Sequence, residues 1–483
     1  LESPRDISKS PPQKGQNSPL RRGWVISFRQ ARVLYPGLWS ADPGAARGAV
    51  VAERGAIRDM LSSVRIGVNK FGTGRDQRGG GDGRRLLLIL TEFPPSFGGM
   101  QTHAVHLCRY LQRRGYRAEV ATYRGPEVEF PFPVHRCLSR IGFVDNLCRL
   151  ETLTRRLRPD VLYASTVFYG RLAAATGIPM IARSAGNDVL RPWIVWPYRW
   201  LSATLGQPWL EDSLYRRFRK MDRPEWVESL LLERRGAEVR QSVRSLAHVL
   251  ANSAYTAGLL QSLSAASVEI LAGGVDAKRF RRQRDTRGEL GLPADRHVVM
   301  TACRMVPKKG LDLLMRAVAR LAGTHLVIAG EGRQRAKCEL LACELGIEGR
   351  TTFTGSVAHH DLRRYYWAAD QFVLASREHV DPRTGLRDVE TMGRVLCEAH
   401  AAGVPVVASR SGGIPSVIDH GRNGLLFEED NLEALVDAME RVRADGSLAR
   451  RLANEGLRDA MERWDWQVVC GGHERAFRAV RGV

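Results

Sequence analysis

Residues 389–409, VETMGRVLCEAHAAGVPVVAS, constrain the fold of this chain more than any other stretch. They predict a loop, a helix, a glycine that ends the helix, and a short buried strand. Gly403 occupies the position where a helix commonly ends in the left-handed conformation, which glycine adopts without strain. The run 404–407 is apolar and rich in valine, as expected of a parallel strand covered on both faces. The stretch therefore predicts one helix-strand unit of an α/β sheet.

Two glutamates, Glu390 and Glu398, stand in this stretch with seven residues between them. The spacing places Glu390 before or at the helix start and Glu398 about two turns inside the helix. Gly393 and Arg394 stand near the start, where free backbone N–H groups and a partial positive charge favour a phosphate. Glu398 could accept hydrogen bonds from a ribose diol, and Glu390 from the hydroxyls of a sugar beyond the phosphates. The alternative is an ordinary amphipathic helix with two solvated glutamates.

The second half of the chain repeats the alternation of strand and helix. Strands are expected at 297–303, 324–329, 351–355 and 371–375, with helices between them. This rhythm predicts a parallel, doubly wound sheet.

Arg304 stands where the first of these strands ends, and Lys309 follows five residues later in a loop that opens a helix. Two cations at the carboxyl end of a strand can clamp a diphosphate, arginine through its planar fork and lysine as a point charge. Breaking a sugar–phosphate bond moves negative charge onto the leaving diphosphate, and fixed positive groups lower that barrier. The alternative is two solvated surface cations.

The first half of the chain opens with an apolar strand at 86–90. A loop with Gly98 and Gly99 follows, then a helix over 100–114 and a strand over 116–122. Glycines at the carboxyl end of a first strand let the backbone approach a phosphate or sugar closely, although tight turns use the same pair.

Several of these segments occur together in one known family. They are R-x4-KG at 304–310, E-x7-E at 390–398 and PVVAS-x-SGGIP at 405–415, in the family's order. On these motifs, residues 86–470 resemble the retaining, nucleotide-sugar-dependent glycosyltransferases of family 4. The resemblance implies the α/β GT-B architecture, in which two Rossmann-like, doubly wound parallel-sheet domains face a cleft.

The resemblance also implies roles for the candidate residues. Glu390, Arg304 and Lys309 would be catalytic, and Glu398 would bind the donor ribose. Further donor-binding positions would be Gly98, Gly99, Gly330, Gly393, Arg394, Asn187 and Asp188. The donor would be a nucleotide-diphosphate sugar, and the acceptor a saccharide or lipid-linked saccharide of cell-surface polysaccharide or glycolipid synthesis. No metal or other cofactor is expected, because the cations take the place of the metal.

The loop 183–188 departs from the family pattern. Many relatives have His-Gly-x-Asp there, with the histidine near the donor sugar, whereas this chain has Ala185 in the histidine's place and keeps Gly186 and Asp188. Asn187 and Asp188 are the candidate substitutes. A retaining front-face mechanism can use the leaving phosphate as the base, so the missing histidine is compatible with activity. Two rival hypotheses stay open, a catalytically degenerate binding scaffold and another GT-B enzyme such as a nucleotide-sugar epimerase.

The pattern along the chain predicts four regions. Residues 1–84 are rich in Arg, Gly, Ser and Pro and are expected to be a disordered or artefactual extension. Because Met60 is the first methionine, residues 1–59 are expected to be either upstream translation or a disordered extension. An acceptor-binding domain over 85–272 and a nucleotide-sugar domain over 273–466 follow. Residues 467–483 are expected to form a helix that crosses back to the first domain.

The net charge of +21 has three explanations. They are arginine-rich codon usage, attraction to an anionic membrane face and, third, nucleic-acid binding, which no motif supports.

Eight scattered cysteines without a CxxC pair indicate a reducing, cytoplasmic location. An insertion at 191–235 holds five of the ten tryptophans, interleaved with arginines. It predicts either a membrane interface or sugar platform for the acceptor at the inner face of the plasma membrane, or a helical pair with its aromatics packed inward.

Overall fold

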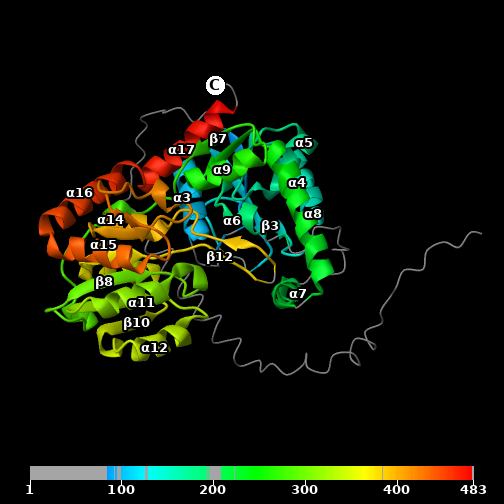
Figure 1. Cartoon of the computed structure of the whole chain (residues 1–483). Helices are drawn as coiled ribbons and strands as arrows, with labels where there is room; N and C mark the ends of the chain where they lie inside the picture. Colours follow the sequence, from blue (N-terminus) through cyan, green and yellow to red (C-terminus); the bar gives the residue numbers. More distant parts are fainter. Residues whose placement is uncertain are drawn as a thin grey trace, which may run out of the picture. The chain divides into compact units, whose positions relative to one another are not determined.

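The computed structural model describes residues 84–91, 93–94, 99–125, 129–192, 194, 208–221, 223–382 and 384–480. The predictions for residues 1–83 and for Gly98 lie outside this part of the chain. Within it, the strands form two large parallel sheets and one short antiparallel hairpin (Figure 1).

The first sheet lies in the N-terminal half of the chain, has the strand order β3-β2-β1-β4-β5-β6-β7, and is parallel throughout. Its strands are β1 (Arg85–Ile89), β2 (Arg117–Tyr123), β3 (Val134–Leu138), β4 (Val161–Ala164), β5 (Met180–Ser184), β6 (His248–Ala251) and β7 (Val268–Ile270). Its main helices are α3 (Gly99–Arg113), α4 (Phe143–Leu157), α5 (Arg171–Thr176), α6 (Asn187–Leu190), α7 (Pro208–Lys220), α8 (Glu225–Arg244) and α9 (Ala254–Ser262). The strand order reverses between β1 and β4, and such a switch point is where open α/β sheets bind ligands.

The second sheet, in the C-terminal half, has the order β10-β9-β8-β11-β14-β15. Its strands are β8 (His297–Ala302), β9 (Thr324–Ala329), β10 (Thr351–Gly355), β11 (Gln371–Leu374), β14 (Val406–Ser409) and β15 (Leu425–Phe427). Helices α10 (Ala277–Phe280), α11 (Leu311–Arg320), α12 (Arg335–Glu344), α13 (His359–Ala368), α14 (Arg394–Ala401), α15 (Leu432–Ala444) and α16 (Gly446–Glu462) accompany it. Along β8, Val298 and Met300 pack into one apolar cluster and Val299 into another. The sheet is thus covered on both faces, which confirms the predicted doubly wound fold.

The predicted elements agree with the structure to within a few residues. Gly403 has a φ of +69° just after α14, as the helix-ending position requires. The depth of Glu398 in the helix was wrong. Gly393 has a φ of +82°, so α14 begins only at Arg394, and Glu398 lies about one turn inside.

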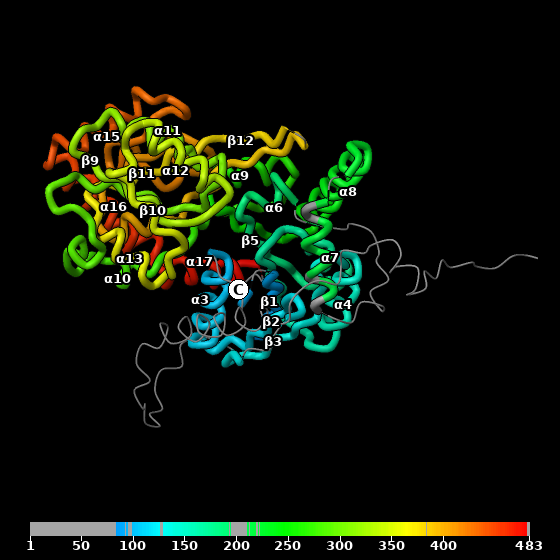
Figure 2. The backbone as a smooth tube through the Cα atoms, turned by 90° about the horizontal axis from the view of Figure 1, so that it is seen from below, coloured from blue at the N-terminus to red at the C-terminus, as the bar shows by residue number. Residues whose placement is uncertain are grey.

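The last helix, α17 (Trp466–Ala479), packs against α3 in the N-terminal half, and Figure 2 shows the two side by side. His473 of α17 meets His103 of α3, with Nε2 atoms 3.2 Å apart. The ring of Trp466 stacks on His106 at a centroid distance of 4.5 Å. His103 and His106 therefore lie in a packed helix pair.

Helix α7 and the first part of α8 make up most of the described residues of the insertion at 191–235. Trp193, Trp196 and Trp200 lie outside the described residues. Trp226, near the start of α8, is 72% exposed and therefore is not packed inward. In the part of the chain that the structure describes, every helix is too short or too polar to cross a bilayer.

Candidate functional site

The two predicted cations lie together after β8, at the switch point of the second sheet. Lys309 belongs to a short 3₁₀ turn, Pro307–Lys309, and its Nζ contacts the carboxylate of Glu390. Burial alone lowers the pKa of Lys309, but the charge of Glu390 outweighs it, so the pKa lies above its usual value. Arg304 is exposed, and among the described residues its side chain has no hydrogen-bond or ion-pair partner. The positive charge of Arg304 repels that of Lys309 and by itself lowers the pKa of Lys309. The guanidinium of Arg304 is available to bind an anion.

Glycines allow the backbone to reach this arrangement. Gly310 has a φ of +57°, and a Cβ there would overlap the carbonyl oxygen of Ala375 at the end of β11. Gly330 has a φ of +139°, and a Cβ there would overlap the carbonyl of Cys303, next to Arg304. Gly330 therefore supports the Arg304 loop from the neighbouring strand β9. Only glycine lets the loop after β8 lie this close to the ends of both neighbouring strands.

The loop 411–413 packs against the backbone of Glu390. The N–H of Gly413 donates to the carbonyl of Glu390 at 2.8 Å, and a Cβ on Gly412 or Gly413 would overlap the 390–391 backbone. Burial raises the pKa of Glu390, but the charges of Lys309 and Lys308 and the N–H of Gly393 outweigh this and hold the pKa below its usual value. Glu390 is therefore an anion with a fixed position.

Glu398 is buried in α14, 2% exposed, and its carboxylate is already hydrogen-bonded. His359 Nε2 lies 3.2 Å from Oε1, the hydroxyl of Tyr366 donates to Oε2 at 3.1 Å, and Arg394 Nε lies 3.5 Å from Oε1. Burial raises the pKa of Glu398, but His359, Arg394 and Tyr366 outweigh it, so the pKa is lowered. The side chain of His359 is 44% exposed, so this is the contact that an entering ligand can replace.

Contacts between the two halves of the chain meet at the same segments. Arg394 donates to the carbonyl of Gly99, at the start of α3, at 3.0 Å. The hydroxyl of Thr391 donates to the carbonyl of Ala185 at 2.6 Å. The loop in which relatives have a histidine therefore lies directly against the residue that follows Glu390.

The two candidate substitutes for that histidine have different surroundings. Asp188 is fully buried, and its oxygens accept hydrogen bonds from Ser184 Oγ at 2.7 Å and from the N–H of Val167 at 3.1 Å. Burial raises its pKa despite these bonds. Asp188 thus holds the turn that leads into α6. The Oδ1 of Asn187 is buried and has no hydrogen-bond partner among the described residues.

Five residues that complete this region were not predicted from the sequence. They are Lys308, Asp388, Arg191, His359 and Tyr366. Lys308 had a detectable signal, since it stands next to Lys309. The others are separated by long stretches of chain from the residues that they contact, so no local pattern marks them.

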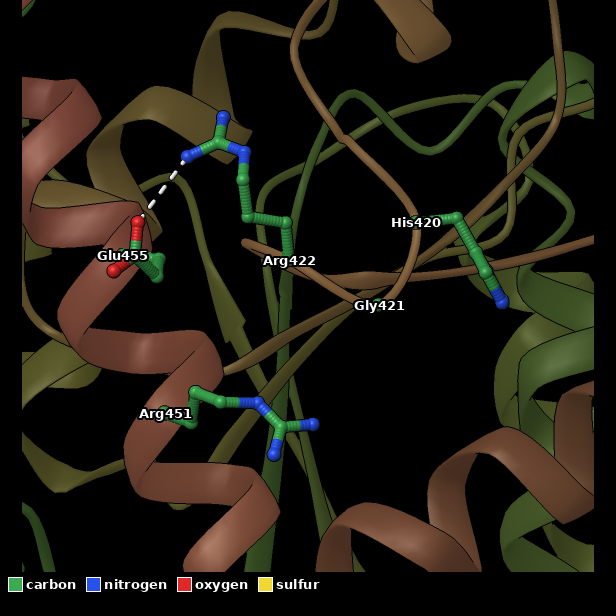
Figure 3. Close-up of a pocket in the computed structure, with 5 residues that line it drawn as sticks. All are labelled: His420, Gly421, Arg422, Arg451 and Glu455. Carbon is green, nitrogen blue, oxygen red and sulfur yellow. Dashed lines mark hydrogen bonds and ion pairs between the residues drawn. The ribbon is translucent and has the colours of Figure 1, made fainter.

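The structure also has an open cavity beside α16 (Figure 3). His420, Gly421, Arg422, Arg451 and Glu455 line it. Arg422 pairs with Glu455, and also with Asp419 and Asp459, so its charge is neutralised. The lining includes none of the predicted site residues, and the cavity is separate from the cations after β8.

Known proteins match both halves of the chain. Residues 97–279 match the profile "Glycosyltransferase Family 4", and residues 282–459 match "Glycosyl transferases group 1". A GDP-mannose-dependent alpha-(1-6)-phosphatidylinositol monomannoside mannosyltransferase of Mycobacterium tuberculosis is 34% identical over 407 residues, 80% of this chain and 96% of that protein. The lipopolysaccharide core biosynthesis glycosyltransferase LpsE of Rhizobium meliloti is 38% identical over 170 residues, 35% of this chain and 46% of LpsE.

Solved structures show the same fold. Sucrose-phosphate synthase from Thermosynechococcus elongatus has a TM-score of 0.64 at 20% identity, over 83% of this chain and 99% of that chain. Anabaena HepE in complex with UDP has a TM-score of 0.61 at 18% identity, over 82% of this chain and 100% of that chain. Sequence and fold agree, and the chain belongs to the family-4 glycosyltransferases as a hexosyltransferase with the GT-B fold.

Proposed function

We propose that this enzyme moves a hexosyl unit from a nucleotide-diphosphate sugar to a saccharide or lipid-linked acceptor, with retention of anomeric configuration. One observation carries the proposal. Lys309 is paired with Glu390, while Arg304 beside it has no counter-charge among the described residues. In this proposal a diphosphate supplies the missing negative charge, and Glu390 accepts hydrogen bonds from the attached sugar.

The proposed step uses the leaving group as its base. The acceptor hydroxyl bonds to the anomeric carbon while the bond from that carbon to the diphosphate oxygen breaks, and the hydroxyl proton passes to the departing phosphate. Arg304 and Lys309 stabilise the charge that develops there. Neither a histidine at position 185 nor a metal is required.

GDP-mannose is the first donor to test, because the relative that spans 80% of this chain is described as GDP-mannose-dependent. UDP-glucose is the comparison donor, since a HepE structure contains it. Each donor is incubated with purified enzyme and a phosphatidylinositol mannoside, a lipopolysaccharide core oligosaccharide or no acceptor, with and without EDTA.

We expect transfer from one donor, undiminished by EDTA, with an α-linked product by NMR. A β-linked product contradicts retention, and loss of transfer with EDTA contradicts the metal-free step. Donor binding, seen as a thermal shift, without turnover on any acceptor favours the binding scaffold instead.

We further propose that the corner between α7 and α8 binds an anionic membrane surface at the cytoplasmic face, where a lipid-linked acceptor is presented. Met221, Trp226 and Leu230 are 47%, 72% and 49% exposed at this corner. The run Tyr-Arg-Arg-Phe-Arg-Lys at 215–220 directly precedes Met221. Apolar side chains that enter the interface beside a basic run match the chemistry of acidic lipid headgroups.

Vesicle flotation tests this surface. The enzyme is expected to float with phosphatidylcholine vesicles that contain phosphatidylglycerol, and the double variant Trp226→Ser/Leu230→Ser to lose most of that binding. Leu340→Ser is the matched control, because Leu340 is 62% exposed on α12 in the other half of the chain. Failure to float, or equal loss in the control, contradicts membrane docking at this corner. Equal flotation with vesicles of phosphatidylcholine only, without phosphatidylglycerol, would contradict a role of the basic run 215–220 in binding acidic headgroups.

A further inference from the structure

The carboxylate of Asp388 binds one cation from each half of the chain. Its Oδ2 accepts from Arg191 Nη1 at 2.6 Å, and its Oδ1 accepts from Lys308 Nζ at 2.8 Å. Lys308 is only 4% exposed, and its Nζ also donates to the carbonyl of Val389 at 3.1 Å. The carboxylate of Asp388 thus links Arg191 to Lys308, which are far apart in the sequence and belong to different halves of the chain.

Both cations stand next to the proposed reaction site. Lys308 precedes Lys309 in the same 3₁₀ turn, so any movement of Lys308 moves the lysine that faces the diphosphate. Arg191 directly follows α6, the short helix that begins after Ala185 and Gly186. Asp388 therefore connects the phosphate-binding turn with the loop in which relatives have their histidine.

The position of Asp388 explains how this residue of the C-terminal half contacts Arg191 of the N-terminal half. It ends the hairpin of β12 (His379–Val380) and β13 (Arg387–Asp388), two residues before Glu390. Figures 1 and 2 both show this hairpin beside α6, and β13 contacts α6. Two neighbouring lysines consequently hold two nearby acids, Lys308 on Asp388 and Lys309 on Glu390.

We propose that Asp388 is a positioning residue of the transfer reaction, which sets the distance between the Lys308–Lys309 turn and the α6 loop through Arg191. The proposal rests on the proposed function, because the distance matters only if a diphosphate binds at Lys309. Small errors in the placement of reacting groups reduce the rate strongly while donor binding persists. Arg304 and Lys309 continue to hold the donor when the link to Arg191 is absent.

Arg191→Gln is the informative variant, because it removes only the link between the halves and leaves the buried Lys308–Asp388 pair intact. The side chain of Arg191 is 39% exposed, so the variant is expected to fold. We expect kcat to fall by about tenfold while the donor KM changes less than about twofold, as misplacement without loss of binding requires. Arg191→Lys should recover most of kcat. In the Asp388→Asn background, Arg191→Gln should cause no further loss, because the two changes remove the same contact.

Salt provides a readout that a purely structural role does not affect. Because the Arg191–Asp388 pair is partly exposed, raising the NaCl concentration should lower kcat of the wild-type enzyme more than that of Arg191→Gln. The matched control is Arg410→Gln, which removes an ion pair of 2.8 Å with Glu428 that lies within the C-terminal half. This control should keep the wild-type kcat and salt response.

The outcomes separate this proposal from the proposed function. If the wild-type enzyme transfers a sugar and Arg191→Gln keeps its kcat, or if the losses in Arg191→Gln and Asp388→Asn simply add, the role of Asp388 is wrong and the activity stands. If the wild-type enzyme neither binds nor uses any nucleotide sugar, the proposed function fails first, and with it the basis for a positioning residue.

Discussion

Lys309→Ala is expected to lower kcat by roughly 10²–10³-fold, the loss that follows removal of one charge-stabilising donor from an active site. The side chain of Lys309 is only 11% exposed and carries a full charge beside Arg304. In this partly dry position its charge acts more strongly on a leaving diphosphate than it would in water. Steady-state transfer assays with the identified donor measure the effect.

A second readout is the pH profile of the same variant. Lys309 is the largest influence that lowers the pKa of Glu390 against its burial. Without Lys309 the pKa of Glu390 rises, so Glu390 becomes protonated at a higher pH. The acid limb of the plot of kcat against pH should therefore shift to higher pH. Lys337→Ala is the control, because Lys337 is an exposed lysine on α12. Wild-type turnover in Lys309→Ala would refute the assignment of the diphosphate cations.

Glu398→Gln is expected to weaken the binding of the free nucleoside diphosphate by about 10- to 100-fold, the range for losing hydrogen bonds to a charged group. At saturating donor, kcat should change much less, because the ribose lies far from the bond that breaks. The ribose diol would replace the contact from the half-exposed His359, while Tyr366 keeps the carboxylate in place. Titration calorimetry with GDP and UDP measures the affinity.

The control for this variant is Glu339→Gln, which changes an exposed glutamate on α12 that pairs with Arg335. Thermal midpoints of both variants show whether the buried glutamine disturbs folding. Unchanged nucleotide affinity in a folded Glu398→Gln enzyme would show that this glutamate belongs to the core of the C-terminal half and not to a ribose site.

The sequence determined the elements and their order, because each depends on local rules. The apolar run 86–89 forms most of β1, and the run 404–407 overlaps β14, which begins at Val406. Gly403 ends α14 because its φ of +69° suits glycine better than other residues. Lys309 and Glu390 were both expected near one site, because each precedes a helix at the carboxyl edge of one parallel sheet. Their direct contact was found only in the structure.

Tertiary structure alone decided which polar groups meet across the two halves. Arg191 and Asp388 lie 197 positions apart, and no periodicity or motif links them. Asn187 and Asp188 are neighbours in the sequence, but their side chains have different surroundings. The carboxylate of Asp188 accepts a hydrogen bond from Ser184 in the N-terminal half, whereas the amide oxygen of Asn187 has no hydrogen-bond partner among the described residues. Local pattern specifies how a segment folds because backbone sterics and apolar burial act within a few residues. Charge pairing acts through space, so the partners of charged side chains that lie in different halves of the chain, such as Arg191 and Asp388, were decided only by the tertiary structure.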